Sequence, residues 1–144
     1  MNIINKIDTS VQNITSVECF NQLSAISSSY LIDVRTKPEW EFIGVPDLTS
    51  FNKKTIFISW HVYPEMKINS LFENQLIKLN IKKTDKLFLI CRSGGRSFQA
   101  AKFLSSFGYH YCFNITDGFE GEKNNLNQRS TINGWKRNNL PWKQ

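Results

Sequence analysis

Four short apolar runs divide the chain, and each has the length and composition of a buried β-strand. Branched aliphatic and aromatic residues dominate them, which is typical of strands covered on both faces. The runs span residues 30–34, 55–59, 86–91 and 111–115. Elsewhere apolar residues recur at helical spacing, and this periodicity predicts helices over residues 17–23, 71–79 and 97–107.

The alternation of predicted strands and helices favours an α/β domain with a mainly parallel sheet. In such a sheet the carboxyl ends of the strands share one edge, and that edge carries functional sites. Two of the strands end in polar residues: Asp33 and Arg35 close the first, and Cys91 and Arg92 close the third. We therefore expect these four residues to lie along one active edge.

Length and composition fit one globular domain. The 144 residues include 40% hydrophobic residues and eleven phenylalanines, enough for a single core. We expect a weakly ordered N-terminal segment over residues 1–14 and a single domain over residues 15–144. The polar stretch at residues 121–133 predicts an exposed loop.

Charge and cysteine content narrow the function classes. The net charge of +6 favours anionic partners, but the basic residues are spread along the chain, so we expect no nucleic-acid binding. No apolar run is long enough to span a bilayer, and the first residues lack a secretory signal pattern, so we expect no membrane association and a cytoplasmic location. Three cysteines without a CxxC pair, and only two histidines, predict no disulfide framework and no metal site.

The run Cys91-Arg92-Ser93-Gly94-Gly95-Arg96-Ser97 carries the strongest functional signal. It follows a strand and precedes a helix, so the thiol lies where unpaired helix N–H groups and two arginines favour negative charge. The adjacent glycines let the backbone turn its N–H groups inward and form an anion-binding concavity. A lone cysteine is most often a small buried hydrophobe. Two arginines beside it, costly to bury unpaired, favour a nucleophile instead.

Three motifs, in this order, resemble those of the single-domain rhodanese (sulfurtransferase) family. They are Leu31-Ile32-Asp33-Val34-Arg35 followed by Glu39-Trp40, the run from Cys91 to Ser97, and Asp117-Gly118-Phe119-Glu120-Gly121. The later Gly134-Trp135 and Pro141-Trp142 are also similar to the end of that domain. The resemblance extends from about residue 15 to the C-terminus.

The resemblance implies a rhodanese-like α/β fold, with a five-stranded, mainly parallel sheet flanked by helices on both faces. It also implies a thiosulfate sulfurtransferase without a cofactor. Cys91 would take a sulfane sulfur from thiosulfate or a persulfide donor and pass it to cyanide, a thiol or a protein acceptor. Amides of the loop would cradle the persulfide, and its two arginines would favour a small anionic donor. The loop residues are Arg92, Ser93, Gly94, Gly95, Arg96 and Ser97.

Asp33, Arg35 and Glu39 are the candidate supporting residues. The first two pair either with each other or with Glu39, and we favour a structural, loop-bracing role over substrate contact. Where many rhodaneses carry Gly-His-Ile-Pro, this chain has Gly44-Val45-Pro46, which argues against a histidine near the pocket. Trp60 either lines the pocket or belongs to the core or surface.

Two other function classes compete with sulfur transfer. Cysteine phosphatases and arsenate reductases also hold a thiolate in an anion-binding loop, but there five residues separate cysteine from arginine. Here Arg96 comes one position earlier, and the smaller loop favours one terminal sulfur over a tetrahedral oxyanion. A sulfur-relay or protein-binding module with protein partners is the second alternative, and the sequence leaves it open.

Overall fold

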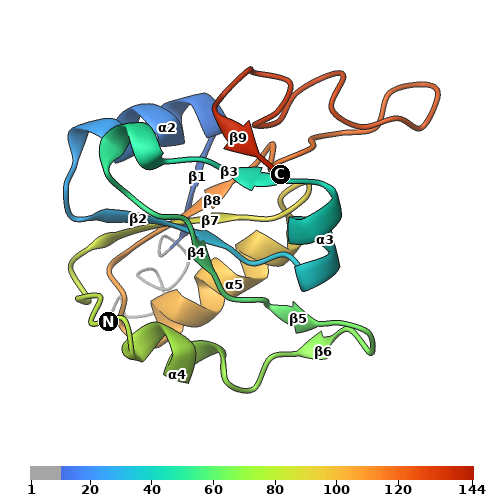
Figure 1. Ribbon diagram of the computed structural model, residues 1–144. Coiled ribbons are helices and arrows are strands. Elements are labelled where there is room, and N and C mark those ends of the chain that lie inside the picture. The colour runs from blue at the N-terminus through green and yellow to red at the C-terminus, as the bar shows by residue number, and fades with distance from the viewer. Residues whose placement is uncertain (1–10) are drawn as a thin grey trace, which may run out of the picture.

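The computed structural model describes residues 11–144 and shows a central five-stranded sheet between layers of helices (Figure 1). The strand order is β1-β8-β7-β2-β4, and every neighbouring pair is parallel. The strands are β1 (Val11–Ile14), β2 (Ser29–Asp33), β4 (Ile56–Phe57), β7 (Lys86–Ile90) and β8 (Tyr111–Ile115). The expected α/β fold with a five-stranded parallel sheet is confirmed.

The helices divide between the two faces of this sheet. Helix α2 (Ser16–Ala25) covers one face, and α4 (Phe72–Ile77) and α5 (Gly95–Ser106) cover the other (Figure 1). Strand β7 alternates accordingly: Leu87 and Leu89 join the core beside α4 and α5, whereas Phe88 and Ile90 join the core beside α2. Cys91 continues the alternation and lies on the α5 side. Helix α3 (Lys37–Phe42) follows the carboxyl end of β2.

Short elements complete the chain. Strand β3 (Val45–Pro46) pairs antiparallel with β9 (Trp142–Lys143), which joins the C-terminus to the segment after α3. Strands β5 (His61–Val62) and β6 (Lys67–Ile68) form a small hairpin, and η1 (Thr49–Phe51) is a single 3₁₀ turn. Within residues 11–144, no helix combines the length and apolar character needed to cross a membrane.

The edge strand β1 belongs to the stretch for which we expected weak order. Residues 11–14 pair with β8 from Val11 opposite Cys112 to Ile14 opposite Ile115. The remainder of that stretch, residues 1–10, lies outside the described residues. Directly after β1, Thr15 caps α2: its side chain accepts a hydrogen bond from the Glu18 amide.

Helix α5 begins at Gly95, two residues before the predicted start. Its cap is Gly94, with φ of 108°, a backbone conformation that glycine adopts without strain. A side chain at this position would also meet the Thr116 carbonyl, which lies 2.7 Å from the ideal Cβ. The loop therefore turns sharply and brings the first amides of α5 close to the end of β7.

Candidate active site at the carboxyl edge of the sheet

Cys91 follows β7 directly and lies beneath the turn that opens α5. Its side chain is 1% exposed, but the neighbouring loop residues Arg92 and Ser93 face solvent. The Gly94 amide donates to the sulfur at 3.1 Å, and the Ser97 hydroxyl oxygen lies 3.2 Å from it. The sulfur therefore has polar neighbours on the loop side, although the rest of its surroundings is apolar core.

The segment from Asp117 to Gly121 packs against the back of this loop. The Phe119 amide donates to the Cys91 carbonyl at 2.8 Å, and the amides of Glu120 and Gly121 both donate to the Arg92 carbonyl. Gly118 has φ of 63°, and a Cβ there would collide with the same carbonyl. The sequence motif at residues 117–121 thus acts as a brace that fixes the loop backbone.

The two arginines of the loop have different surroundings. Arg96 makes a two-pronged ion pair with Glu39, with N···O distances of 2.7 and 2.9 Å. This pair joins the first turn of α5 to α3. Arg92 is exposed, and within the described residues its guanidinium makes no hydrogen bond or ion pair. Arg92 is therefore the loop arginine whose charge is available to a dissolved anion.

Glu39 is ionised because of this pairing. Burial raises the pKa of Glu39, but hydrogen bonds and charge attraction from Arg96, together with bonds from Thr36, outweigh it and lower the pKa from 4.5 to about 2. The Thr36 amide and hydroxyl both donate to Glu39 Oε1, at 3.1 and 2.8 Å. One carboxylate therefore caps α3 and holds α5.

We expect Glu39→Gln to lower the free energy of unfolding at neutral pH by about 1–2 kcal/mol. The folded-state pKa of Glu39 lies below the unfolded value of 4.5. The ionised carboxylate therefore makes its full contribution to the free energy of unfolding above about pH 4.5, and this contribution is lost as the pH falls towards about 2. Urea unfolding of both proteins over this range measures the difference. A gap between wild type and variant that stays constant down to the lowest pH would contradict the ion-pair explanation.

Asp33 and Arg35 pair with each other, and Glu39 pairs elsewhere. Arg35 Nη2 lies 2.8 Å from Asp33 Oδ2, and both side chains are fully buried. The same nitrogen donates to the Gly44 carbonyl at 2.7 Å, and the guanidinium lies 4.3 Å from the centre of the Phe119 ring. Buried in this way, neither residue contacts solvent, and the pair connects β2 to the brace behind the cysteine loop.

Trp60 belongs to the core. It is 5% exposed, its ring packs edge-on against Phe72 and its indole N–H donates to Gln99 Oε1 at 3.3 Å. The sequence allowed Trp60 to line the pocket or to belong to the core or surface, and in the structure it packs in the core.

Asn114 is a site residue that the sequence reasoning missed. It lies on β8, is 5% exposed, and accepts a 2.6 Å hydrogen bond from the Ser97 hydroxyl, which also contacts Cys91. A polar residue inside a buried strand needs a hydrogen-bond partner. An asparagine within the apolar run at residues 111–115 could therefore have been recognised from the sequence as a residue with a buried polar contact. The sequence could not show which partner the fold would bring.

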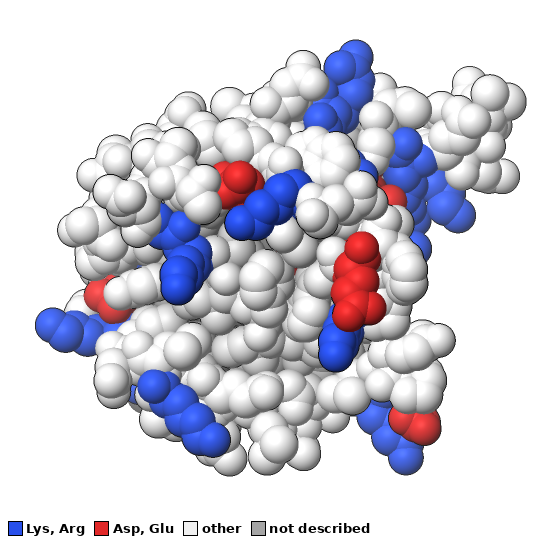
Figure 2. All heavy atoms as spheres, viewed as in Figure 1, with Lys and Arg blue, Asp and Glu red and all other residues white. Residues whose placement is uncertain are grey.

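The surface charge on the face seen in Figure 2 is dispersed. Lysines and arginines are scattered between neutral residues, with acidic side chains among them (Figure 2). Within residues 11–144, no group of three or more His, Cys, Asp or Glu side chains is placed to hold a metal ion.

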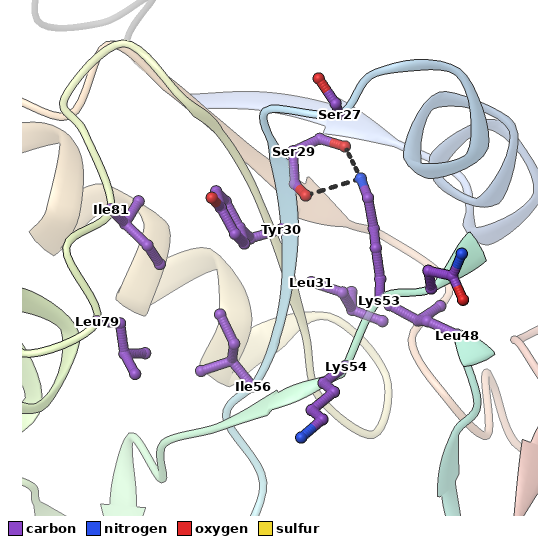
Figure 3. A pocket seen from close by; sticks show the side chains of 11 residues that line it. Ser27, Ser29, Tyr30, Leu31, Leu48, Lys53, Lys54, Ile56, Leu79 and Ile81 are labelled. Atoms are coloured by element: carbon purple, nitrogen blue, oxygen red, sulfur yellow. Dashed lines mark hydrogen bonds between the residues drawn. The ribbon is translucent and has the colours of Figure 1, made fainter.

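A separate cavity of about 390 Å³ opens beside the amino end of β2 (Figure 3). Tyr30, Ile56 and Ile81 form part of its apolar wall. The Lys53 amine is bound to the Ile26 carbonyl and to both oxygens of Ser29, at 2.7–2.9 Å. This cavity lies at the opposite end of β2 from Asp33, and the amine of its partly buried lysine is already bound to Ile26 and Ser29.

The fold is of the rhodanese-like type, and three solved structures share it. Rv0390 from M. tuberculosis superposes with a TM-score of 0.84 at 33% identity, covering 92% of this chain and 97% of that one. The polysulfide-sulfur transferase homodimer from Wolinella succinogenes superposes with a TM-score of 0.64 at 17% identity, covering 97% of this chain and 83% of that one. A rhodanese-like domain protein from Staphylococcus aureus superposes with a TM-score of 0.54 at 20% identity, covering 74% of this chain and 86% of that one. The last two show the fold alone.

The chain belongs to the STR4 middle domain family, whose model matches residues 11–144. Protein RC0915 of Rickettsia conorii is 44% identical over 134 residues, which is 92% of this chain and 98% of that protein. The rhodanese-like fold is thus shown by the solved structures, whereas membership of the single-domain rhodanese family in particular stays a prediction, because the matching model is that of the STR4 middle domain.

Proposed function

We propose that this protein is a sulfurtransferase that carries a sulfane sulfur on Cys91 as a persulfide. The observation that carries the proposal is the position of the Cys91 sulfur under the N-terminus of α5, with the Gly94 amide donating to it. A helix N-terminus and inward amides favour a thiolate and any anion attached to it. The polysulfide-sulfur transferase of Wolinella succinogenes has the same fold, which supports the class of reaction.

With thiosulfate as donor, the Cys91 thiolate attacks the outer sulfur. The bond from Cys91 Sγ to that sulfur forms, the sulfur–sulfur bond of thiosulfate breaks, and sulfite leaves with the electron pair. A thiol or cyanide acceptor then attacks the outer sulfur of the persulfide, and Cys91 departs as a thiolate. The acceptor ends with the sulfur and the enzyme is restored. Neither step calls for a cofactor, because the cysteine acts as a covalent carrier.

The charges around the loop fit an anionic donor of this kind. Arg92 is exposed and unpaired within the described residues, so it can attract thiosulfate and then release sulfite. Arg96 instead stabilises the loop through Glu39. We propose a small anionic donor on these grounds and a dissolved thiol, cyanide or a protein thiol as acceptor. The three cysteines in the described chain are free, which fits a reducing compartment such as the cytosol.

The ion pair of Arg96 also argues against a phosphatase. A phosphatase loop uses its arginine to clasp a tetrahedral oxyanion. Both outer nitrogens of Arg96 already bind the Glu39 carboxylate, at 2.7 and 2.9 Å. Turning this guanidinium to phosphate would break a two-pronged ion pair and leave the partly buried Glu39 carboxylate without its counter-charge. Sulfur transfer requires no such rearrangement.

Intact-protein mass spectrometry after incubation with thiosulfate tests the proposal. We expect a gain of one sulfur atom, located on the peptide that contains Cys91 and removed by cyanide. Inorganic phosphate and a phosphate ester serve as matched anions and should leave no adduct. Absence of the sulfur adduct, both with thiosulfate and with a persulfide donor, would overturn the proposed function.

A further inference from the structure

Ser97 stands between the reactive sulfur and a buried amide. Its hydroxyl oxygen is 3.2 Å from Cys91 Sγ and 2.6 Å from Asn114 Oδ1, and all three side chains are at most 5% exposed. A serine hydroxyl carries one hydrogen and can donate to only one of these neighbours. The direction of that single hydrogen bond decides whether the Cys91 sulfur faces the hydrogen of the Ser97 hydroxyl or its oxygen lone pairs.

The hydroxyl donates to Asn114, so its oxygen lone pairs face the sulfur. In this orientation Ser97 can accept a hydrogen bond from a Cys91 thiol, but it offers nothing to a thiolate, which only accepts. The Gly94 amide acts in the opposite sense, because it donates to the sulfur at 3.1 Å. The loop therefore contains one group that favours the thiolate and one that favours the thiol.

The position of Asn114 in the sheet explains why its oxygen faces Ser97. Strand β8 lies between β1 and β7, and Asn114 is in register with Asn13 on one side and Leu89 on the other. Its amide nitrogen points to Asn13 Oδ1, with a long contact of 3.4 Å. The Nδ2 group of Asn114 therefore faces the edge strand β1, and its Oδ1 atom faces the Ser97 hydroxyl and accepts the hydrogen bond from it.

We infer that Asn114 is a positioning residue that holds the Ser97 hydroxyl away from the sulfur and so opposes the ionisation of Cys91 that the Gly94 amide favours. The inference rests on the proposed function only in taking Cys91 as the nucleophile. A protonated sulfur is less open to oxidation, since the thiolate is the species that oxidants attack. A Ser97 hydroxyl that turns from Asn114 to the sulfur would instead favour the thiolate.

Charged residues on the elements around Cys91 are the same in every variant proposed below. They are Arg96 on α5, its partner Glu39 on α3, the Asp33–Arg35 pair after β2, Arg92 in the loop, and Asp117 and Glu120 in the brace. A change in ionisation caused by a neutral substitution at position 114 or 97 therefore reports the hydrogen bond and not a lost charge.

Titration of the Cys91 thiolate by its ultraviolet absorbance tests the inference. The spectrum of Cys91→Ser is subtracted at each pH, which removes the signals of the other cysteines and the tyrosines. With Leu in place of Asn114, Ser97 loses its competing acceptor and can donate to the sulfur. We expect Asn114→Leu to increase the ratio of thiolate to thiol by about threefold to tenfold below the midpoint.

A double-mutant cycle shows whether Asn114 acts through Ser97. In a Ser97→Ala background the hydroxyl is absent, so Asn114→Leu should no longer change the titration. Asn114→Ala provides a second variant without the amide, should leucine fit poorly in the buried site. Ser106→Ala is the matched control: it removes a hydroxyl from the same helix, bound there to the Phe103 carbonyl, and should leave the titration unchanged.

An unchanged or decreased thiolate fraction in both Asn114 variants would overturn the inference, as would an increase that persists without the Ser97 hydroxyl. The titration uses no sulfur donor, so its result is independent of sulfur transfer. A protein that gains no sulfur from any donor would refute the proposed function and still report the Asn114 effect.

Discussion

Replacing Cys91 by serine is expected to reduce sulfur transfer to the uncatalysed background while preserving the fold. A serine oxygen cannot form the persulfide, and its hydroxyl does not ionise near neutral pH. The substitution is close in size, and the new oxygen can still accept the hydrogen bond that the Gly94 amide now gives the sulfur. We therefore expect the free energy of unfolding to change by no more than about 1–2 kcal/mol. Thiosulfate-to-cyanide assays and urea unfolding measure the two quantities.

The other two cysteines supply matched controls. Burial raises the pKa of Cys112 to about 12, and burial with the nearby Asp117 raises the pKa of Cys19 well above its usual value. Neither forms an appreciable thiolate at neutral pH, so Cys19→Ala and Cys112→Ala should retain sulfur transfer. Undiminished transfer by Cys91→Ser, or a sulfur adduct on either control residue, would contradict the assignment of Cys91.

Sequence patterns predicted the interior of the sheet well and its edge poorly. The run at residues 86–91 is almost wholly apolar because both faces of β7 are covered, and its strand lies within one residue of the predicted bounds. Strand β1 is Val-Gln-Asn-Ile, with two exposed polar residues, and it pairs on one side only. A four-residue edge strand of this composition has no apolar run to reveal it.

In the candidate site, features formed by neighbouring residues could be predicted from the sequence, whereas contacts between distant residues could not. The cysteine loop could be read from consecutive residues, since a strand end, two glycines and a helix start are all local signals. The partner of Arg96 is 57 residues away at Glu39, and that of Ser97 is on another strand at Asn114. Such partners depend on the order of strands in the sheet, which local pattern does not specify. Asp33 and Arg35, two residues apart, were one of the pairings foreseen.

The buried Asp33–Arg35 pair gives the largest expected effect on stability. Three bonds join the Arg35 side chain to the Asp33 carboxylate, at 2.8–3.2 Å, and both residues are 0% exposed. Arg35 Nη1 has no hydrogen-bond partner among the described residues. Asp33→Ala would leave this guanidinium buried without its counter-charge. We expect the free energy of unfolding to fall by about 3–5 kcal/mol, measured by urea unfolding.

Removal of both charges separates the cost of an unpaired charge from the cost of lost packing. In Asp33→Ala/Arg35→Met no charge is buried, and methionine retains much of the contact with the Phe119 ring. The double variant should therefore be less destabilised than the sum of the two single variants by about 1–3 kcal/mol. Glu39→Gln, at the partly exposed pair with Arg96, provides the comparison and should cost less than Asp33→Ala. Additive losses, or a cost for Asp33→Ala no greater than that of Glu39→Gln, would show that the buried pair does not stabilise the fold through the attraction of its two charges.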